Sequence, residues 1–264
     1  MKAYTGKTAL ITGASSGIGL ALAHALARRG PHVLLTARST ETLKEVAVGI
    51  QKTGVDAHVF PEDLSRRGAA QRLHDAVTRE GLTVALLINN AGYGRWGAFN
   101  EFARDDYGAM IQLNITALTE LCHLFIPDMV TRGGGGVINV GSIASFLPVP
   151  YASVYASSKA YVLLLSDALR FEYAEQGVRI MTLCPGWTNT NFRTIAATTV
   201  GADLGDVGDS PEQVAEQGLD AYLRDKAYVI TGEGNKKYAL LPRFLSRQRL
   251  LNLAGRSFRR RLGR

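Results

Sequence analysis

Cysteine is scarce in this chain. Among 264 residues only Cys122 and Cys184 occur, and they form no CxxC spacing. A domain of this length buries roughly three quarters of the surface of its unfolded chain, so its core does not depend on disulfides. Isolated thiols are typical of a reducing compartment. We therefore predict two buried, unreactive cysteines and a cytoplasmic location.

Metal-binding and membrane-spanning patterns are also missing from the sequence. The five histidines form no HxxxH or HExxH pair, so we expect no metal site. The first apolar run, residues 8–11, is too short for the core of a signal peptide. No later stretch reads as apolar enough to cross a bilayer. These absences exclude a metalloenzyme, a leader-bearing protein and an integral membrane protein from the expected classes.

Acidic residues are absent from residues 236–264, which contain ten of the 30 Lys and Arg residues. The net charge of +7 therefore comes from this segment, and the rest of the chain is mildly acidic. A nucleic-acid-binding core would spread its basic residues over one face of the fold, so we expect no nucleic-acid partner. Several apolar residues of the segment, including Leu240, Leu241, Phe244 and Leu245, follow helical spacing. Two interpretations stay open: a basic amphipathic helix on an anionic membrane surface, or a helix docked on its own subunit or on a dimer mate.

Short apolar runs alternate with longer amphipathic ones through most of the chain. This pattern predicts strands at 8–12, 32–36, 55–60, 84–89, 137–140, 179–183 and 228–231, and helices at 18–29, 41–53, 66–80, 104–130 and 153–176. Such alternation requires crossover connections, which give a parallel sheet covered on both faces. We predict a single-domain α/β Rossmann fold, a doubly wound parallel sheet of about seven strands, over residues 1–235. Residues 236–264 form a basic amphipathic extension, and 189–209 lack a period and are expected to be a loop.

A glycine-rich turn joins the first strand to the first helix. Its residues are Gly13, Ser15, Ser16, Gly17, Ile18 and Gly19. Glycines at this position let a pyrophosphate approach the backbone, and the helix N-terminus offers free N–H groups to the anion. The second strand ends without the acidic residue that would bond an adenosine ribose, and Arg38 follows it instead. Arg38 can pair with a 2′-phosphate, so we predict NADP(H) in preference to NAD(H).

With further motifs the sequence resembles the short-chain dehydrogenase/reductase family over almost its whole length, to about Gly232. The matching residues are the glycine turn, the pair Asp63-Leu64, Asn89-Asn90-Ala91-Gly92, Asn114, Ser142, Tyr155 with Lys159 in YxxxK spacing, and Pro185-Gly186 followed by Thr190. Position 188 is Thr where the family often has Val or Ile, and we expect little consequence because the backbone usually makes the contact there. Within the family the chain looks most like the generic bacterial DltE-like branch. The resemblance implies that Asp63, Leu64, Asn90, Ala91, Gly92, Pro185, Gly186, Thr188 and Thr190 bind the cofactor together with the glycine turn, Arg38, Tyr155 and Lys159.

The resemblance implies a catalytic set of Asn114, Ser142, Tyr155 and Lys159. Tyr155 and Lys159 are four residues apart on one helix, so they share a face. We expect the lysine to lower the pKa of the phenol, which then acts as general acid/base. Ser142 would hold the substrate oxygen, and Asn114 would connect Lys159 to solvent through water. The expected enzyme interconverts a carbonyl and an alcohol with NADP as acceptor.

A second YxxxK pair, Tyr222 and Lys226, has no serine at a strand end before it and is interpreted as a surface pair. Two other functions stay open. One is a regulatory or redox-sensing Rossmann protein that binds NADP with little turnover. The other is an epimerase or dehydratase of nucleotide sugars, for which the chain offers little room for a substrate domain.

The substrate is expected beyond the carboxyl ends of the strands, where aromatic residues gather in the sequence. The expected walls are Tyr93, Trp96, Phe146, Tyr151 and Trp187, with Ser142 at the reacting oxygen, and with Arg95 and Phe192 nearby. An equally weighted alternative is that half of the aromatic residues pack in the core. The set predicts an apolar or bulky small molecule. By resemblance, the family associates through its two long helices, which implies a homodimer or homotetramer.

Overall fold

The computed structural model describes residues 6–190, 192, 196 and 208–261. Within this part of the chain, seven strands form one sheet in the order β3-β2-β1-β4-β5-β6-β7, and every neighbouring pair is parallel. The strands are β1 Thr8–Thr12, β2 His32–Thr36, β3 Ala57–Val59, β4 Val84–Asn89, β5 Gly135–Val140, β6 Val178–Cys184 and β7 Tyr228–Ile230. The predicted doubly wound α/β fold is confirmed.

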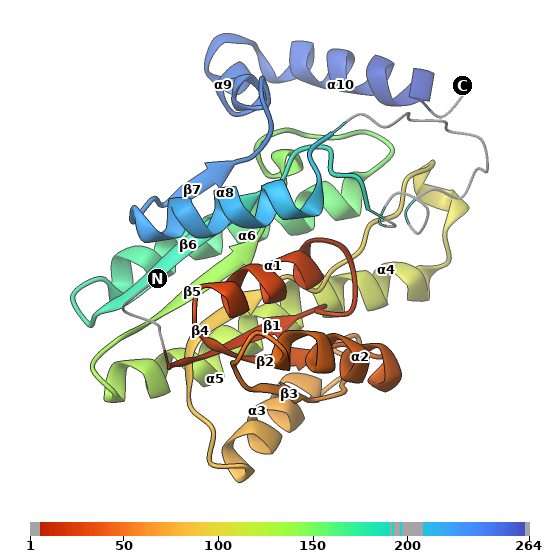
Figure 1. The fold of residues 1–264 in the computed structure, drawn as a ribbon. Coiled ribbons are helices and arrows are strands. Elements are labelled where there is room, and N and C mark those ends of the chain that lie inside the picture. Colours follow the sequence, from red (N-terminus) through yellow and green to blue (C-terminus); the bar gives the residue numbers. More distant parts are fainter. Residues whose placement is uncertain (1–5, 191, 193–195, 197–207, 262–264) are drawn as a thin grey trace.

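Helices cover both faces of the sheet (Figure 1). One face carries α1 Gly17–Arg28, α2 Thr40–Gln51 and α8 Pro211–Leu223, and the other carries α3 Ala69–Arg79, α5 Leu118–Thr131 and α6 Ser153–Tyr173. Because both faces are buried, the strands are nearly continuous apolar runs such as the VALLIN of β4. The order of the strands reverses direction between β1 and β4, and in such folds ligands bind at the carboxyl ends of these strands.

The predicted long helix at 104–130 is divided into three parts. α4 Arg104–Ile111 leads into a π-helical turn, Gln112–Ala117, and α5 continues to Thr131. Together the three parts are long and apolar enough to span a membrane by composition, so the expectation that no stretch qualifies was wrong. The helix instead packs its apolar residues, among them Leu121, Phe125 and Met129, against the sheet. It is a core helix, which passes the same test as a membrane span.

The C-terminal segment contains two helices where the sequence pattern suggested one. α9 spans Lys236–Phe244 and α10 spans Arg247–Arg261. Leu245 is extended between them, and the Ser246 hydroxyl accepts a hydrogen bond from the Arg249 N–H, which starts α10. Both helices lie beyond β7 in Figure 1. Leu250 of α10 is buried and Phe258 packs against Trp96, so α10 contacts the rest of the chain, as the second alternative expects. Contact with an anionic membrane stays a prediction.

Both cysteines are free and buried, as predicted. Burial raises the pKa of each thiol to about 12, so neither forms a reactive thiolate near neutral pH. Within the described residues, no three His, Cys, Asp or Glu side chains converge as metal ligands would.

Candidate active site

The glycine turn forms a close-fitting cradle between β1 and α1. Gly13 and Gly17 have φ values of 67° and 55°, in the left-handed region that favours glycine. A Cβ on Gly19 would lie 2.2 Å from the Gly13 carbonyl oxygen, so no larger residue fits there. No side chain caps the N-terminus of α1, and its first turn contains no acidic residue. Its N–H groups and positive dipole end can therefore receive an anion such as a pyrophosphate.

Asn90 fixes the cradle to the end of β4. Its Nδ2 donates to the carbonyl oxygens of Thr12 and Gly13 at 2.9 and 3.3 Å. The Thr12 hydroxyl accepts hydrogen bonds from the Asn90 and Ala91 N–H groups, both at 2.9 Å. The predicted Asn90, Ala91 and Gly92 segment thus lies beside the glycine turn, where it can border a dinucleotide.

Arg38 lies just beyond β2 and is exposed. Within the described residues Arg38 forms no ion pair. Burial raises the pKa of the Asp63 carboxyl, but hydrogen bonds from Ser65 and the charges of Arg38 and Arg66 together lower it more, so the net shift is downward. The Asp63 carboxylate accepts hydrogen bonds from the N–H and hydroxyl of Ser65, at 3.1 and 2.6 Å. Leu64 is buried in the core, which leaves its backbone as the part that can meet a cofactor. Arg38 thus stands exposed at the end of β2, and its contact with a 2′-phosphate stays a prediction.

The segment after β6 closes the other side of the cradle. The Pro185 carbonyl accepts a hydrogen bond from the Ile143 N–H at 3.0 Å, and a Cβ on Gly186 would lie 1.9 Å from Asn235 Nδ2. Thr188 is buried and forms a bridge with Asp209. The Thr190 methyl would lie 3.3 Å from a Cβ on Gly17. The predicted corner and the glycine turn therefore meet, although they are far apart in the sequence. Most of the loop predicted at 189–209 lies outside the described residues.

Ser142, Tyr155 and Lys159 come together at the carboxyl ends of β5 and β6. Ser142 follows β5 after Gly141, and its hydroxyl forms a hydrogen bond with the Tyr155 phenol. Lys159 lies one turn along α6 from Tyr155, with Nζ 5.9 Å from the centre of the phenol ring. The Lys159 ammonium donates to the Val140 carbonyl oxygen at 2.7 Å. The two residues share one face of α6, as their spacing predicts.

Asn114 holds the loop after β4 against this group. Its side chain is buried in the π-helical turn, and its amide donates to the Tyr93 carbonyl at 2.9 Å and to Ser158 Oγ at 3.1 Å. Its Oδ1 accepts from the Tyr93 N–H, and a Cβ on Gly92 would lie 3.0 Å from Oδ1 and 3.4 Å from Lys159 Nζ. Asn114 and Lys159 therefore both lie beside Gly92, and their connection through water stays a prediction. π-Helical turns are rare and frequently occur at functional sites.

The ionisation of the pair differs from the expectation. Burial raises the pKa of Tyr155 to about 12, and the hydrogen bond with Ser142 offsets only part of this effect. Burial also lowers the pKa of Lys159 to about 8. The prediction that Lys159 brings the phenol pKa down toward working pH is therefore wrong for this arrangement, because the ammonium bonds Val140 and desolvation dominates. The phenol is neutral at physiological pH and holds its proton.

A family model described as short chain dehydrogenase matches residues 7–200. The chain belongs to the short-chain dehydrogenases. It is 30% identical over 233 residues to the ketoacyl reductase HetN of Nostoc, covering 88% of this chain and 81% of the relative. It is 30% identical to the 7beta-hydroxysteroid dehydrogenase of Clostridium sardiniense over 96% of both chains. A short-chain dehydrogenase from Sphingobium yanoikuyae, solved in complex with NADPH, superposes with a TM-score of 0.82 at 30% identity, covering 89% of this chain and 92% of that one.

An aromatic cluster adjoins the phenol of this dehydrogenase. Trp96, Trp187 and Phe192 pack edge to face, with ring centres of Trp96 5.6 and 6.1 Å from the other two. Phe192 lies 5.5 Å from the Tyr155 ring, and both rings press against the backbone of Gly94. Three of the predicted wall residues are therefore brought together beside the reacting group.

Other predicted wall residues lie elsewhere. Phe146 packs against Tyr228 and joins a separate apolar cluster, so its place in a substrate pocket stays a prediction. The Tyr93 hydroxyl donates to the Asp106 carbonyl, and Arg95 lies over the Tyr93 ring and pairs with Asp106 at 3.4 Å. Both serve the local fold. The alternative that some of these aromatics pack structurally is confirmed for this group.

The dehydrogenase also uses residues that sequence reasoning missed. Phe258 of α10 packs edge to face on Trp96 at 6.4 Å. Asn235 donates to the Thr231 carbonyl at 2.8 Å and lies against Gly186. Ser145 Oγ accepts from the Ser142 N–H and donates to the Lys159 carbonyl. Ser145 was detectable from its place in the turn after β5, whereas no local pattern connects Phe258 with Trp96.

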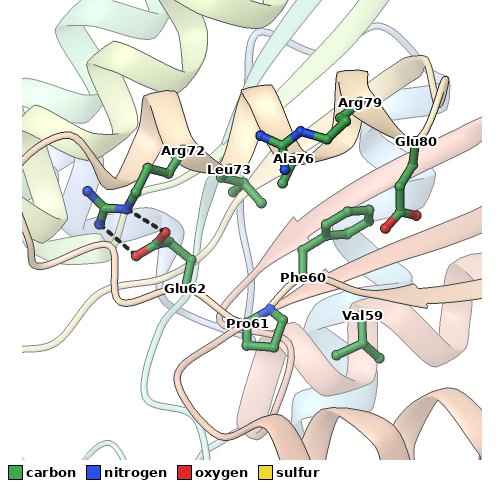
Figure 2. A pocket seen from close by; sticks show the side chains of 9 residues that line it. All are labelled: Val59, Phe60, Pro61, Glu62, Arg72, Leu73, Ala76, Arg79 and Glu80. Carbon is green, nitrogen blue, oxygen red and sulfur yellow. Dashed lines mark hydrogen bonds and ion pairs between the residues drawn. The ribbon is translucent and has the colours of Figure 1, made fainter.

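One surface hollow lies apart from this site. Figure 2 shows it between β3 and α3, lined by Val59, Phe60, Pro61, Glu62, Arg72, Leu73, Ala76, Arg79 and Glu80. Its central charges, Glu62 and Arg72, are bonded to each other at 2.8 Å. None of the predicted site residues lines it, so we do not assign it a catalytic role.

Proposed function

We propose that the protein is an NADP(H)-dependent oxidoreductase that interconverts a carbonyl and an alcohol, with Tyr155 as general acid/base. The observation that carries this proposal is the convergence of Ser142, Tyr155 and Lys159 on one point beside the glycine cradle. The cradle lies between β1 and α1, Ser142 follows β5, and Tyr155 and Lys159 lie on α6. A protein that only senses a nucleotide has no need of a buried phenol hydrogen-bonded to a serine.

A bound nicotinamide would supply or accept the hydride at the reacting carbon. In reduction, Tyr155 donates its proton to the carbonyl oxygen, and Ser142 holds that oxygen by a hydrogen bond as negative charge develops. A neutral phenol carries the proton that reduction requires. Lys159, held by Val140 and next to Gly92, is placed to bind a ribose hydroxyl and to stabilise the phenolate that remains. Asn114 positions the Gly92–Tyr93 backbone around it.

Support for NADP(H) comes from Arg38, an exposed guanidinium at the end of β2 where no carboxylate stands. The related structure from Sphingobium holds NADPH. Support for an apolar, bulky carbonyl compound comes from the Trp96, Trp187 and Phe192 rings beside Tyr155. The relatives named a ketoacyl reductase and a hydroxysteroid dehydrogenase agree with such a substrate. Assignment to the DltE-like branch and a cytoplasmic location stay predictions.

The test is NADPH oxidation by the full chain with a panel of aldehydes, bulky ketones and long-chain oxo compounds. Replacing Tyr155 with Phe should lower kcat by about 10²–10⁴-fold, because general acid catalysis contributes that much. The matched control is Tyr161→Phe on the same helix, whose hydroxyl bonds only Thr119 at the surface. Tight NADPH binding without turnover of any compound would favour the regulatory alternative.

We also infer a homo-oligomer formed through α5 and α6. Phe171 is 89% exposed and Leu164 is 70% exposed on α6, so both large apolar side chains lie in solvent in the single chain. A second copy of the chain would cover them. Light scattering after size exclusion should show a dimer or tetramer, and replacing both residues with Ser should yield monomers.

Contact with an anionic membrane remains a separate proposal. Leu240, Phe244 and Leu253 are exposed on α9 and α10 among basic residues, which suits an interfacial helix. The opposite face of α10 packs against the chain itself, so among the described residues of the two helices these three exposed apolar side chains are the ones that can enter lipid. Flotation with phosphatidylserine vesicles should fall after Phe244→Ser, and equal flotation of both proteins would end the idea.

A further inference from the structure

Helix α10 packs across the segment that joins Ser142 to Tyr155. Its inward residues recur at helical spacing and are Leu250, Leu251, Ala254, Gly255 and Phe258. A Cβ built on Gly255 would lie 3.5 Å from Pro150 Cγ, an ordinary van der Waals distance, so α10 approaches this segment closely at Gly255. Figure 1 shows α10 running beside the green segment that links β5 to α6. The helix therefore lies at the substrate side of the site.

Phe258 extends the aromatic cluster outward from the phenol. Ring contacts lead from Tyr155 to Phe192, then to Trp96, and then to Phe258, at 5.5, 6.1 and 6.4 Å. Ala152 and Ala196 are buried in the same cluster. The cluster thus forms a continuous row of apolar side chains from the proton donor, Tyr155, to Phe258 on α10.

Tyr151 stands where this row meets α10, and its backbone is strained. Its φ is 66°, in the left-handed region that bulky residues rarely adopt. Its carbonyl accepts a hydrogen bond from the Gly97 N–H at 2.8 Å, and its hydroxyl accepts one from Arg259 Nε at 3.3 Å. Strained conformations of this kind tend to occur at functional sites. Here the strain places a phenol hydroxyl against a guanidinium.

Arg259 keeps its charge available for a ligand. The hydrogen bond to Tyr151 uses Nε, and no acidic side chain of the described residues forms an ion pair with it. Its neighbours Arg256 and Arg260 are also cationic and exposed, and α9 and α10 contain no Asp or Glu. When Nε is bonded to Tyr151, the two terminal nitrogens of the guanidinium can donate hydrogen bonds to a carboxylate or a phosphate.

We propose that α10 forms the outer wall of the substrate chamber and that Arg259, aligned by Tyr151, binds an anionic group on the outer end of an apolar carbonyl substrate. The carbonyl lies at Tyr155, the apolar body lies along Trp96 and Phe258, and the carboxylate or phosphate lies at Arg259. This inference rests on the proposed function and specifies its substrate: an apolar chain with a carbonyl at one end and a negative charge at the other.

The experiment compares two matched pairs of substrates, each measured by NADPH oxidation with the full-length protein. One pair is a long-chain oxo acid and its methyl ester, which tests a carboxylate. The other pair is a 3-oxoacyl coenzyme A thioester and the same acyl group on N-acetylcysteamine, which tests a phosphate. We expect the wild-type enzyme to have a lower KM for the charged member of at least one pair. The pair that discriminates identifies the source of the charge.

Arg259→Gln should raise the KM of that charged member by about 3–10-fold, the effect of losing one exposed charge-assisted contact. It should leave kcat for both members, and the KM of the neutral member, unchanged. Arg260→Gln is the matched control, because it removes the same charge from the outward face of α10. Tyr151→Phe removes the hydroxyl that bonds Arg259 Nε, so it should raise the same KM by a smaller factor.

Three results would overturn the inference while leaving the proposed function intact. The wild type could treat both members of each pair alike, Arg259→Gln could impair neutral and charged compounds equally, or Arg260→Gln could have the same effect as Arg259→Gln. Absence of NADPH oxidation with all four compounds would refute the inference, and activity with other carbonyl compounds in the wider panel would show that the proposed function survives.

Discussion

Gly19 offers a sharp test of the cradle that receives the cofactor. The structure leaves no room for a side chain there, because a Cβ would lie 2.2 Å from the Gly13 carbonyl oxygen and 2.4 Å from Asn90 Nδ2. Real Cβ atoms essentially never approach other atoms this closely. Gly19→Ala must therefore displace either the turn or the amide that bonds the Thr12 and Gly13 carbonyls.

The magnitude follows from two opposing effects. Alanine in a helix gains about 1 kcal/mol over glycine, whereas a methyl group forced into a packed backbone costs about 1–3 kcal/mol or more. In a domain of this size each kcal/mol changes Tm by about 2–4 °C. The net loss is about 0–2 kcal/mol, so we expect Gly19→Ala to lower Tm by up to about 8 °C, measured by differential scanning fluorimetry. The Kd for NADPH should rise by about tenfold or more, because the displaced atoms border the phosphate site.

The matched control is Gly49→Ala. Gly49 also lies in a helix, but the atom nearest to its Cβ position is His24 Cε1 at 3.9 Å, an ordinary contact. This variant should gain stability by about 0.5–1 kcal/mol and leave NADPH binding unchanged. A Gly19→Ala protein with wild-type Tm and wild-type NADPH affinity would refute the close-packed cradle.

Three further predictions use other parts of the site. Arg38→Ala should raise the Kd for NADPH by about tenfold, the value of one charge-assisted phosphate contact, and leave the Kd for NADH unchanged in fluorescence titrations; equal losses for both would remove Arg38 from cofactor selection. The pKa of Lys159 is lowered to about 8 by burial, so kcat/KM should fall as pH rises through about 8 and the ammonium loses its proton; a profile that is flat through pH 9 would contradict a role for that charge. Asn139→Ala removes the buried acceptor of Asn89 and the donor to Ser166, at 2.9 Å each. This variant should lower the free energy of unfolding, measured in urea, by about 2–3 kcal/mol. A loss below about 0.5 kcal/mol would show that the hydrogen bonds of Asn139 are dispensable for stability.

The sequence predicted the strand and helix order well because both faces of the sheet are buried. Continuous apolar runs such as β4 and the helical period of α1 are local patterns, and local patterns are readable in sequence. The shortest elements were less well predicted. β3 is limited to Ala57–Val59 where residues 55–60 were expected, because the edge of the sheet provides only one pairing partner. The division of the 104–130 helix by a π-helical turn left no sequence signal.

In the site, too, local features were predictable from the sequence and features that depend on tertiary packing were not. Spacing alone placed Tyr155 and Lys159 on one face of α6, and the glycine turn was recognisable because its backbone demands glycine. The pKa values were not predictable, since they depend on burial by residues distant in sequence and on the bond from Lys159 to Val140. Desolvation is a property of the packed molecule, and it reversed the direction expected for the phenol.

By itself, the sequence determined the fold and the chemistry of the central residues, since residue type and spacing specify backbone conformation and the reactive groups on one helix face. Only the tertiary structure decided what surrounds those groups. It placed Phe258 on Trp96 and Arg259 on Tyr151, more than a hundred positions apart in the chain. Contacts at such separation depend on how helices pack across the sheet edge, and no local pattern encodes that packing.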